Sequence, residues 1–184
     1  ESVELIRKAK KSGLSITADV HLANLLYNEE TVLGFDSNFK FMPVLRTEAD
    51  RIALWNGLKD GTIDTVVSDH RPHDKEEKDV EFDHASFGSI QLQSLFGALG
   101  TSEAFDLATI IDAISRRSRT ILSISENPVE KGNKADLTLF IPGKKWTFEK
   151  EQVISKTYNS DLIGKELNGY VVGVVNNGKF ALKE

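Results

Sequence analysis

The sequence predicts an α/β fold in which a parallel sheet with crossover helices precedes a small β unit. Two observations support this prediction. Helical and extended segments alternate through the first 126 residues, and strand-like segments separated by turn residues follow from residue 127 to residue 184. We therefore expect two domains, residues 1–126 and residues 127–184.

The first part is expected to begin with a helix, because an apolar stripe recurs at helical spacing over Val3, Leu5, Ile6 and Ala9. Gly13 lies just beyond its expected end. A strongly apolar strand is expected at residues 63–67. The other elements expected here are extended segments at 14–20 and 39–44, a helix capped by Thr47 and closed at Gly61, and helices at 90–99, 107–116 (capped by Asp106) and 118–124.

The second part is expected to begin near Asn127-Pro128 and Gly132-Asn133, which are turn-forming pairs. Strands are expected beyond them at residues 136–141, 146–148 and 170–175. Residues 176–178 read Asn-Asn-Gly, and Asn-Gly favours a tight hairpin turn into a last strand at 179–182.

The composition excludes several classes of protein. The net charge of −5 and the pI near 5.5 argue against a nucleic-acid-binding surface. The chain has no cysteine, so disulfides and thiolate metal sites are excluded and a cytoplasmic location is expected. No apolar run approaches the roughly 18 residues of a membrane span. Because the chain starts in a helical pattern and without methionine, we expect it to be a fragment.

One motif carries most of the chemistry. Residues 67–78 read VSDHRPHDKEEK, and the apolar run at 63–67 leads directly into them. Catalytic carboxylates are often placed where a buried strand ends and a loop begins. Asp69 is therefore a candidate catalytic residue, and the alternative is an ordinary loop or capping aspartate. The loop at 69–89 is long and polar, which is typical of a functional loop, although its charged run at 74–83 also fits a solvated surface.

Four stretches together resemble the C-terminal part of dihydroorotases, the cyclic-amide hydrolases of the amidohydrolase superfamily. They are ITADV at residues 16–20, MPVLRTEADR at 42–51, SDHRPHDKEEK at 68–78, and the tail from NPVEKGNKADLTLF at 127–140 through residue 179. The resemblance implies the C-terminal part of a (β/α)8 TIM-type barrel followed by a small β-sandwich-like domain. In such a barrel the site lies at the C-terminal ends of the strands.

The resemblance also implies a chemistry. In such enzymes a zinc-bound hydroxide attacks the ring amide of dihydroorotate, and a carboxylate from the last barrel strand moves the proton. Zinc is thus the implied cofactor, a dihydroorotate-like molecule the implied substrate, and pyrimidine biosynthesis the implied pathway. Strands absent from this chain would carry a His-x-His pair and a carboxylated lysine that bridges two metals.

The resemblance assigns roles to individual residues of the loop. Asp69 matches the catalytic carboxylate and a metal contact. His73 matches a histidine that binds the substrate carboxylate, and Gly88 matches a main-chain substrate contact; the alternatives are a surface histidine and a simple turn. Arg71 stands in this substrate-binding loop where a small residue is usual, so its guanidinium could fill or close the pocket.

Two positions depart from the family pattern. Ala23-Asn24 stands where the family has His-His, whose first member binds metal, and alanine has no lone pair to offer. His21 is a poor substitute ligand, because two residues along a strand displace it by roughly 6.6 Å, whereas zinc–nitrogen bonds measure about 2.0–2.1 Å. Met42 replaces an asparagine that helps to hold the substrate. These departures predict an impaired site and leave open whether this chain binds zinc.

Three functions remain open. The first is a dihydroorotase-family protein that is not competent for hydrolysis as this chain. The second is a non-catalytic homologue that scaffolds aspartate transcarbamoylase, as some relatives that lack metal ligands do. The third is another cyclic amidohydrolase with a rearranged site of His21, Asp69 and His73. Because a partial barrel exposes sheet edges and apolar helix faces, we also expect a homo-oligomer.

Overall fold

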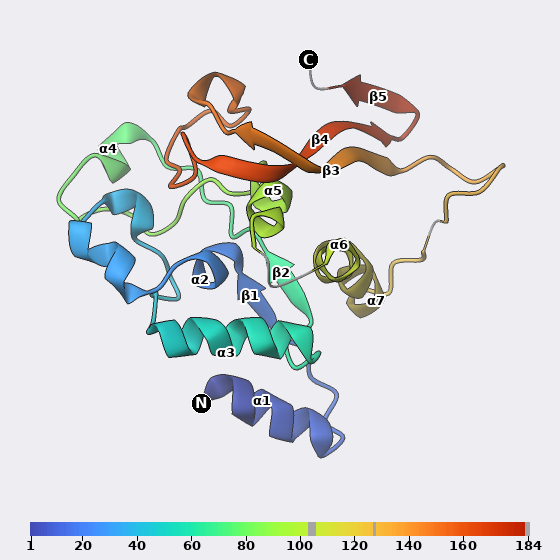
Figure 1. The fold of residues 1–184 in the computed structure, drawn as a ribbon, viewed down its shortest axis with the longest axis horizontal. Helices are drawn as coiled ribbons and strands as arrows, with labels where there is room; N and C mark the ends of the chain where they lie inside the picture. Colours follow the sequence, from blue (N-terminus) through green and yellow to red (C-terminus); the bar gives the residue numbers. More distant parts are fainter. Residues whose placement is uncertain (103–105, 127, 183–184) are drawn as a thin grey trace.

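The computed structural model describes residues 1–102, 106–126 and 128–182. Figure 1 shows helices α1 and α3 on one side of a short parallel strand pair, and an antiparallel sheet formed by the end of the chain on the other side. Asn127, expected at the domain boundary, lies outside the described residues. No helix in the described part of the chain is long and apolar enough to cross a membrane.

The helices and strands follow one another in this order. They are α1 (Ser2–Lys11), β1 (Asp19–His21), α2 (Leu22–Leu26), η1 (Glu29–Gly34), η2 (Ser37–Phe39), α3 (Glu48–Lys59), β2 (Thr65–Val67), α4 (Lys75–Lys78), α5 (Leu95–Gly100), α6 (Leu107–Ile111), η3 (Asp112–Arg116), α7 (Arg117–Ile121), β3 (Leu137–Thr147), η4 (Lys150–Gln152), β4 (Glu166–Asn176) and β5 (Lys179–Leu182).

Helix α1 confirms the first predicted helix. Gly13 follows it with a φ of +86°, a backbone conformation that glycine adopts without steric cost. Two ion pairs join the helix to the segment between α3 and β2: Arg7 to Asp60 at 2.8 Å and Lys10 to Asp64 at 2.7 Å. Both pairs are partly exposed, so they orient α1 more than they stabilise it.

Strands β1 and β2 form a parallel pair. The strand predicted at residues 14–20 is wrong in length, because only its last two residues join the ladder. The reason is a contact that is distant in sequence: the Ala18 backbone N–H donates to the side chain of Asp64 at 2.8 Å instead of to a strand neighbour. Strand β2 lies within the strand predicted at 63–67. Because the two strands run the same way, their C-terminal ends meet at one edge.

Helix α3 confirms the predicted cap, since Thr47 Oγ1 accepts a hydrogen bond from the Asp50 backbone N–H at 3.2 Å. The extended segment expected at residues 39–44 forms no strand. It is instead held by the loop, because the Lys40 carbonyl accepts a hydrogen bond from the Gly88 N–H at 2.8 Å. A sequence pattern of alternating residues cannot distinguish this arrangement from a short strand.

The loop at residues 69–89 is largely irregular, as predicted, with one short helix, α4. The helix predicted at residues 90–99 starts too early, because α5 begins five residues later. The Ile90 N–H donates to the Asn159 carbonyl at 2.8 Å, and the Ile90 carbonyl accepts from Ser160 Oγ at 3.1 Å. These contacts keep Ile90 out of the helix, and a turn at residues 92–94 follows before α5 begins.

The helices predicted at 107–116 and 118–124 merge into one helical segment. Asp106 caps it as expected, accepting a hydrogen bond from the Thr109 N–H at 2.8 Å. Helix α6 continues through a π-helical turn, η3, directly into α7. The segment ends at Ile121, three residues before the predicted end.

The second part folds as an antiparallel sheet in the order β3-β4-β5. The strands predicted at 136–141 and 146–148 are one strand, β3, interrupted by a register shift between Ile141 and Lys145. The hairpin between β4 and β5 is confirmed, with Asn177 at φ +49° and Gly178 at φ +71°. The described residues of this part form one three-stranded sheet rather than two packed sheets, so they do not show the sandwich that was expected.

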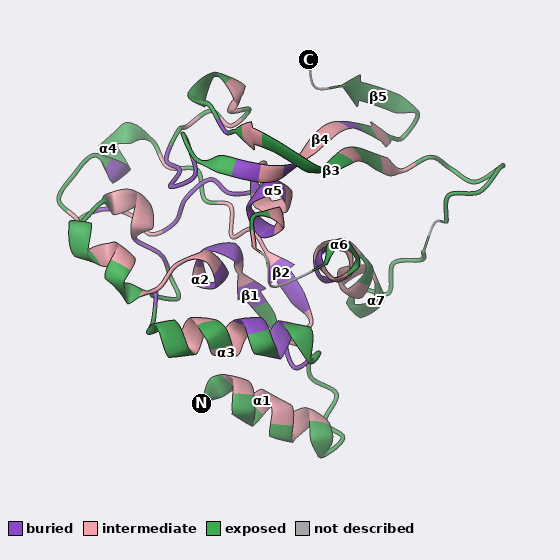
Figure 2. Ribbon diagram, in the orientation of Figure 1, coloured by how far each residue is buried: buried purple, intermediate pink, exposed green. Residues whose placement is uncertain are grey.

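One hydrophobic core joins the two parts of the chain, and Figure 2 shows buried residues on both sides of the junction. Leu22, Leu58 and Ile63 of the first part pack in the same cluster as Phe148 and Leu167 of the second, and each is at most 2% exposed. Full burial of such a side chain contributes about 1.5–3 kcal/mol. The sheet is therefore not an independent appendage.

Helix α5 and strand β4 approach each other closely at this junction. The Asn168 side chain donates to the Gly100 carbonyl at 2.9 Å. A Cβ atom at Gly100 would lie only 2.0 Å from the Asn168 carbonyl oxygen. The absence of a side chain at position 100 is thus a requirement of the packing.

We predict that Gly100→Ala lowers the free energy of unfolding by about 1–3 kcal/mol, because the added methyl group must push α5 and β4 apart. Gly34→Ala is the matched control, since a Cβ there meets no heavy atom within 4 Å. Its effect should stay within about 0.5 kcal/mol. Urea denaturation measures both, and equal effects would contradict the close approach.

Candidate functional site

The candidate site lies where β1 and β2 end. Asp69 follows β2 with a φ of +44°, which turns the chain sharply out of the strand. His21 is the last residue of β1, and its Nδ1 lies 3.3 Å from Asp69 Oδ2. Both side chains are about four-fifths buried, with 22% and 17% of their surface exposed. Parallel pairing of the two strands is what brings these residues together.

Arg71 occupies the other oxygen of the same carboxylate. Its Nε donates to Asp69 Oδ1 at 2.9 Å, while 48% of the arginine side chain remains exposed. The side chain passes directly over Gly88, where a Cβ atom would lie 2.6 Å from Arg71 Cδ. Gly88 also has a φ of +112°, which side chains rarely tolerate. The arginine and the glycine therefore fit one another.

His73 lies on the same loop but does not join Asp69. Its Nδ1 lies 2.8 Å from Glu77 Oε2, and its Nε2 lies 3.0 Å from the Phe87 carbonyl oxygen. Both partners are hydrogen-bond acceptors, so the two hydrogen bonds form together only when both ring nitrogens carry a proton. The ring of His73 is thus engaged within the loop.

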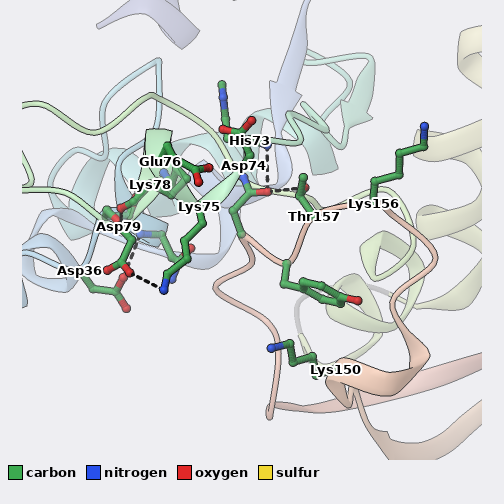
Figure 3. Close-up of a pocket in the computed structure, with 14 residues that line it drawn as sticks. Asp36, His73, Asp74, Lys75, Glu76, Lys78, Asp79, Lys150, Lys156 and Thr157 are labelled. Atoms are coloured by element: carbon green, nitrogen blue, oxygen red, sulfur yellow. Dashed lines mark hydrogen bonds and ion pairs between the residues drawn. The ribbon is translucent and has the colours of Figure 1, made fainter.

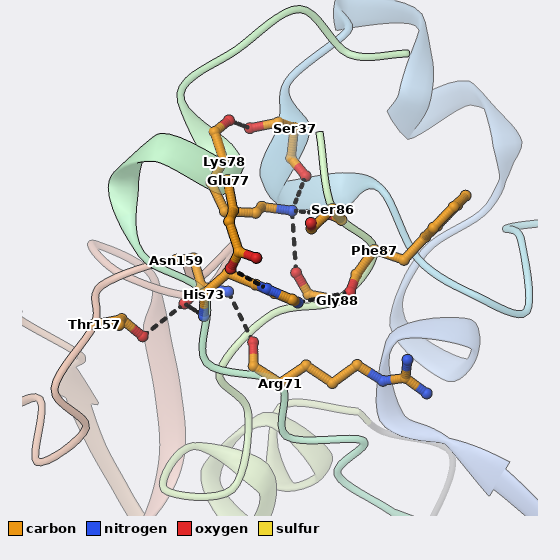
Figure 4. Close-up of polar contacts among 10 residues, drawn as sticks. All are labelled: Ser37, Arg71, His73, Glu77, Lys78, Ser86, Phe87, Gly88, Thr157 and Asn159. Atoms are coloured by element: carbon orange, nitrogen blue, oxygen red, sulfur yellow. Dashed lines mark hydrogen bonds and ion pairs between the residues drawn. The ribbon is translucent and has the colours of Figure 1, made fainter. Parts of the chain in front are cut away.

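Asn159 holds this loop from the second part of the chain, and sequence reasoning missed it. Its Oδ1 accepts the His73 backbone N–H at 3.0 Å, and its Nδ2 donates to the Arg71 carbonyl at 2.9 Å (Figure 4). Thr157 Oγ1 donates to the same Oδ1 at 2.8 Å. The side chain brackets the turn between Arg71 and His73. The only sequence signal is a polar Asn-Ser-Asp run before two apolar residues.

Lys78 is a second residue that sequence reasoning missed. The charged run at 74–83 was expected to be solvated, which is wrong for Lys78, because it is only 5% exposed. Its ammonium donates to the carbonyls of Ser37, Ser86 (2.9 Å) and Gly88 (3.1 Å), as Figure 4 shows. Burial lowers the pKa of Lys78 to about 8. The lysine ties the loop to the segment before α3.

A cavity of about 630 Å³ opens beside this loop, between α4 and the segment that carries Asn159 (Figure 3). His73 lines it, whereas Asp69 does not. Lys150 and Tyr158 form its opposite wall, with the lysine Nζ 4.7 Å from the centre of the tyrosine ring. The cavity and the candidate carboxylate are therefore separate features.

Comparison with known proteins gives these residues a context. No family model matches the chain. Its sequence is 41% identical over 188 residues to a dihydroorotase of Caldicellulosiruptor saccharolyticus, and the alignment covers all of this chain and 44% of the relative. The chain is a homologue of the C-terminal portion of dihydroorotases. It spans less than half the length of the curated dihydroorotases that it matches.

Solved structures share the fold of this dihydroorotase homologue. A D-hydantoinase from Thermus sp. superposes with a TM-score of 0.84 at 21% identity, over 98% of this chain and 42% of that one. An inactive dihydroorotase-like domain of a CAD-like multifunctional protein from Chaetomium thermophilum superposes with a TM-score of 0.71 at 18% identity, over 97% and 47%. The expected α/β fold is confirmed, and it is shared with these solved structures.

The described residues of this chain do not by themselves form a zinc site. Structural and catalytic zinc sites use at least three protein ligands. Within the described residues, no group of three histidine, cysteine, aspartate or glutamate side chains could hold a metal ion. Ala23, at the family's ligand position, is 2% exposed and packs in α2 against Phe41 and Leu45. Arg71 already supplies a cation to Asp69.

We predict that Lys78→Met lowers the free energy of unfolding by about 2–4 kcal/mol at pH 7, because one buried and two partly buried carbonyls lose their donor. Lys75→Met is the control: this neighbouring lysine is 81% exposed, and its ion pair in the described part of the chain is with Asp79 at 3.3 Å.

The effect of Lys78 on stability should also depend on pH. In the unfolded chain the pKa of Lys78 returns to its ordinary value of 10.5. The unfolded chain therefore binds more protons than the folded chain between pH 8 and 10.5.

The stability of the native protein relative to Lys78→Met should therefore be greatest above about pH 10.5 and should decrease as the pH falls through the window to about 8. Urea denaturation at several pH values measures this difference. A difference that does not change with pH would mean that Lys78 titrates as it does in water.

Proposed function

We propose that this protein is a member of the dihydroorotase family of pyrimidine biosynthesis that does not hydrolyse dihydroorotate. The observation that carries the proposal is the ion pair between Asp69 and Arg71, with its 2.9 Å contact. The family resemblance assigns Asp69 to proton transfer beside a metal. A metal ion or a substrate proton that approached Oδ1 of this carboxylate would have to displace the guanidinium.

The surroundings of the carboxylate support the same proposal. Ala23 is buried in the core, so neither its position nor its chemistry supplies a ligand. Met42 is 45% exposed and offers no amide to a substrate. His73 and Gly88, which the resemblance assigns to the substrate, already contact Glu77 and Arg71. Each predicted substrate contact thus has a partner within the chain.

A rearranged metal site of His21, Asp69 and His73 receives less support. His21 and Asp69 do approach each other, at 3.3 Å. The ring nitrogens of His73, however, both face other groups of the loop. Two ligands alone do not hold zinc.

We predict that the full-length protein, purified without chelators, contains far less than one equivalent of zinc and does not convert dihydroorotate and carbamoyl aspartate into one another. Metal analysis and an absorbance assay of the ring provide the measurement, with the Caldicellulosiruptor saccharolyticus dihydroorotase as the positive control. Near-stoichiometric zinc with turnover would overturn the proposal. Asp69→Asn would then have to abolish turnover.

A second candidate function is a scaffold for aspartate transcarbamoylase. It is favoured by the structural likeness to a domain described as an inactive dihydroorotase-like part of a multifunctional protein. Large apolar side chains also lie exposed in η1 and just after it, with Leu33 at 75% and Phe35 at 70%. Such exposed apolar surface is typical of interaction sites, including contacts between copies of one chain.

We predict that aspartate transcarbamoylase co-purifies with the full-length protein and that Leu33→Asp with Phe35→Asp abolishes this association. Val129→Asp is the matched control, because Val129 is 81% exposed but lies in the second part of the chain. Sedimentation of the same variants tests the expected homo-oligomer. Native extract that yields only a monodisperse monomer would contradict both the scaffold and the self-association.

A further inference from the structure

Asp161 is a buried carboxyl group in the segment between η4 and β4, with 6% of its surface exposed. Its Oδ1 accepts hydrogen bonds from Ser89 Oγ at 2.7 Å and from Gln91 Nε2 at 3.1 Å. Its Oδ2 is shielded from solvent and has no hydrogen-bond partner among the described residues. These residues already enclose Oδ2, so a further part of the chain cannot reach it without opening their packing. Within the described part of the chain, one oxygen is therefore satisfied, by two neutral donors.

This environment disfavours a negative charge on Asp161. None of the ion pairs between described residues involves it. A buried charge without a countercharge is costly, and such a group keeps its proton instead. Burial accordingly raises the pKa of Asp161 above its ordinary value of 3.8, although hydrogen bonds oppose the shift. A proton on Oδ2 replaces an unpaired charge with a neutral hydroxyl group.

The titratable groups around Asp161 come from several elements. Burial and the charge of Asp161 raise the pKa of Tyr27, at the end of α2, so the tyrosine hydroxyl stays neutral. The charge of Asp161 also acts on Lys78 of α4, whose ammonium is bound to three backbone carbonyls. Three further charged side chains line a cavity of about 440 Å³ that Asp161 also borders: Asp36, Lys150 and Lys165. None of these groups forms an ion pair with Asp161.

The segment that carries Asp161 also holds the loop at 69–89 in place. Asn159, two residues earlier, binds the backbone of Arg71 and of His73. A change of charge at Asp161 therefore acts directly beside the contacts that position the loop. We propose that Asp161 is a proton-dependent anchor: its protonated carboxyl holds this segment against the loop, and its ionisation weakens the attachment. The proposal is independent of the proposed function, because no metal and no catalytic carboxylate takes part.

The direction of the pH dependence follows from the burial. When the segment is detached, Asp161 faces water and ionises near its ordinary pKa of 3.8. When the segment is attached, Asp161 keeps its proton to a higher pH. The attached state therefore binds one more proton in the interval between these two pKa values, and across it the attachment weakens about tenfold for each unit that the pH rises. Below pH 3.8 both states are protonated, and the attachment is strongest.

Hydrogen exchange of the full-length protein, native and Asp161→Asn, tests the proposal. Asparagine has nearly the same shape as aspartate, its oxygen can accept the same hydrogen bonds, and it carries no charge at any pH. The amides of His73 and Ile90 report the attachment, because both donate to Asn159. At each pH from 5 to 7, the protection factors of these amides in the native protein are divided by those in the variant.

We expect this ratio to fall by at least about tenfold from pH 5 to pH 7, because only the native protein loses a proton at position 161. Lys78 stays charged over this range, which lies below its pKa of about 8. His70 and His73 are present in both proteins, so their own titration cancels in the ratio. Asp79→Asn is the matched control: Asp79 lies on the same loop but its side chain is 71% exposed, so its ratio should change by less than about twofold.

Infrared spectroscopy of the native protein tests the same point without a substitution, and it decides the question if the Asp161→Asn variant does not fold. At pH 6, where carboxyl groups with ordinary pKa values are ionised, the C=O band of a protonated carboxyl should remain. It should disappear at higher pH in parallel with the loss of protection. A ratio that does not change with pH, or the absence of this band at pH 6, would mean that Asp161 is an ordinary carboxylate and that the proposal is wrong.

Discussion

The hydrogen bonds between residues 157–161 and the loop at 69–91 are the contacts on which the candidate site depends. Asn159 fixes the backbone of Arg71 and His73, and the same segment pairs with Ile90 through Ser160. Asp161 continues this pattern, because its Oδ1 accepts from Ser89 Oγ at 2.7 Å and from Gln91 Nε2 at 3.1 Å. The segment between η4 and β4 thus shapes the loop that the strands of the first part present.

Two buried ionisable residues, Lys78 and Asp161, hold the polar loop in place through hydrogen bonds that apolar side chains could not form. Lys78 satisfies three carbonyls from segments far apart in sequence, and Asp161 joins two side chains of the segment before α5. Burial raises the pKa of Asp161, while it lowers that of Lys78. Burial of an ionisable group is tolerated only when hydrogen bonds compensate for the lost water. Through these hydrogen bonds the two residues anchor the loop near its middle and at its C-terminal end.

The features that the sequence predicted well are those with local causes. The first helix, the Thr47 cap and the Asn-Gly hairpin each follow from residues within one or two turns of each other. The errors have distant causes. The strand at 14–20 is short because Asp64 takes a backbone donor, and the helix at 90–99 starts late because of Asn159 and Ser160.

The candidate site shows the same division between local and distant causes. The position of Asp69 at the end of a strand could be predicted from the motif, and its approach to His21 follows from parallel pairing. The partner of Asp69 was not assigned from sequence, although Arg71 was recognised as out of place in the loop. Asn159 lies 88 residues from Arg71, so no sequence period connects them. Lys78, whose ammonium group binds carbonyls of the loop, was not recognised from sequence because it lies within a run of charged residues.

The close packing of Arg71 on Gly88 links two positions that are separated by sixteen residues of loop. A side chain at position 88 would displace the arginine and leave the Asp69 carboxylate without its cation. The two positions are therefore coupled: the arginine at position 71 requires glycine at position 88, and a change at either position alters the surroundings of Asp69.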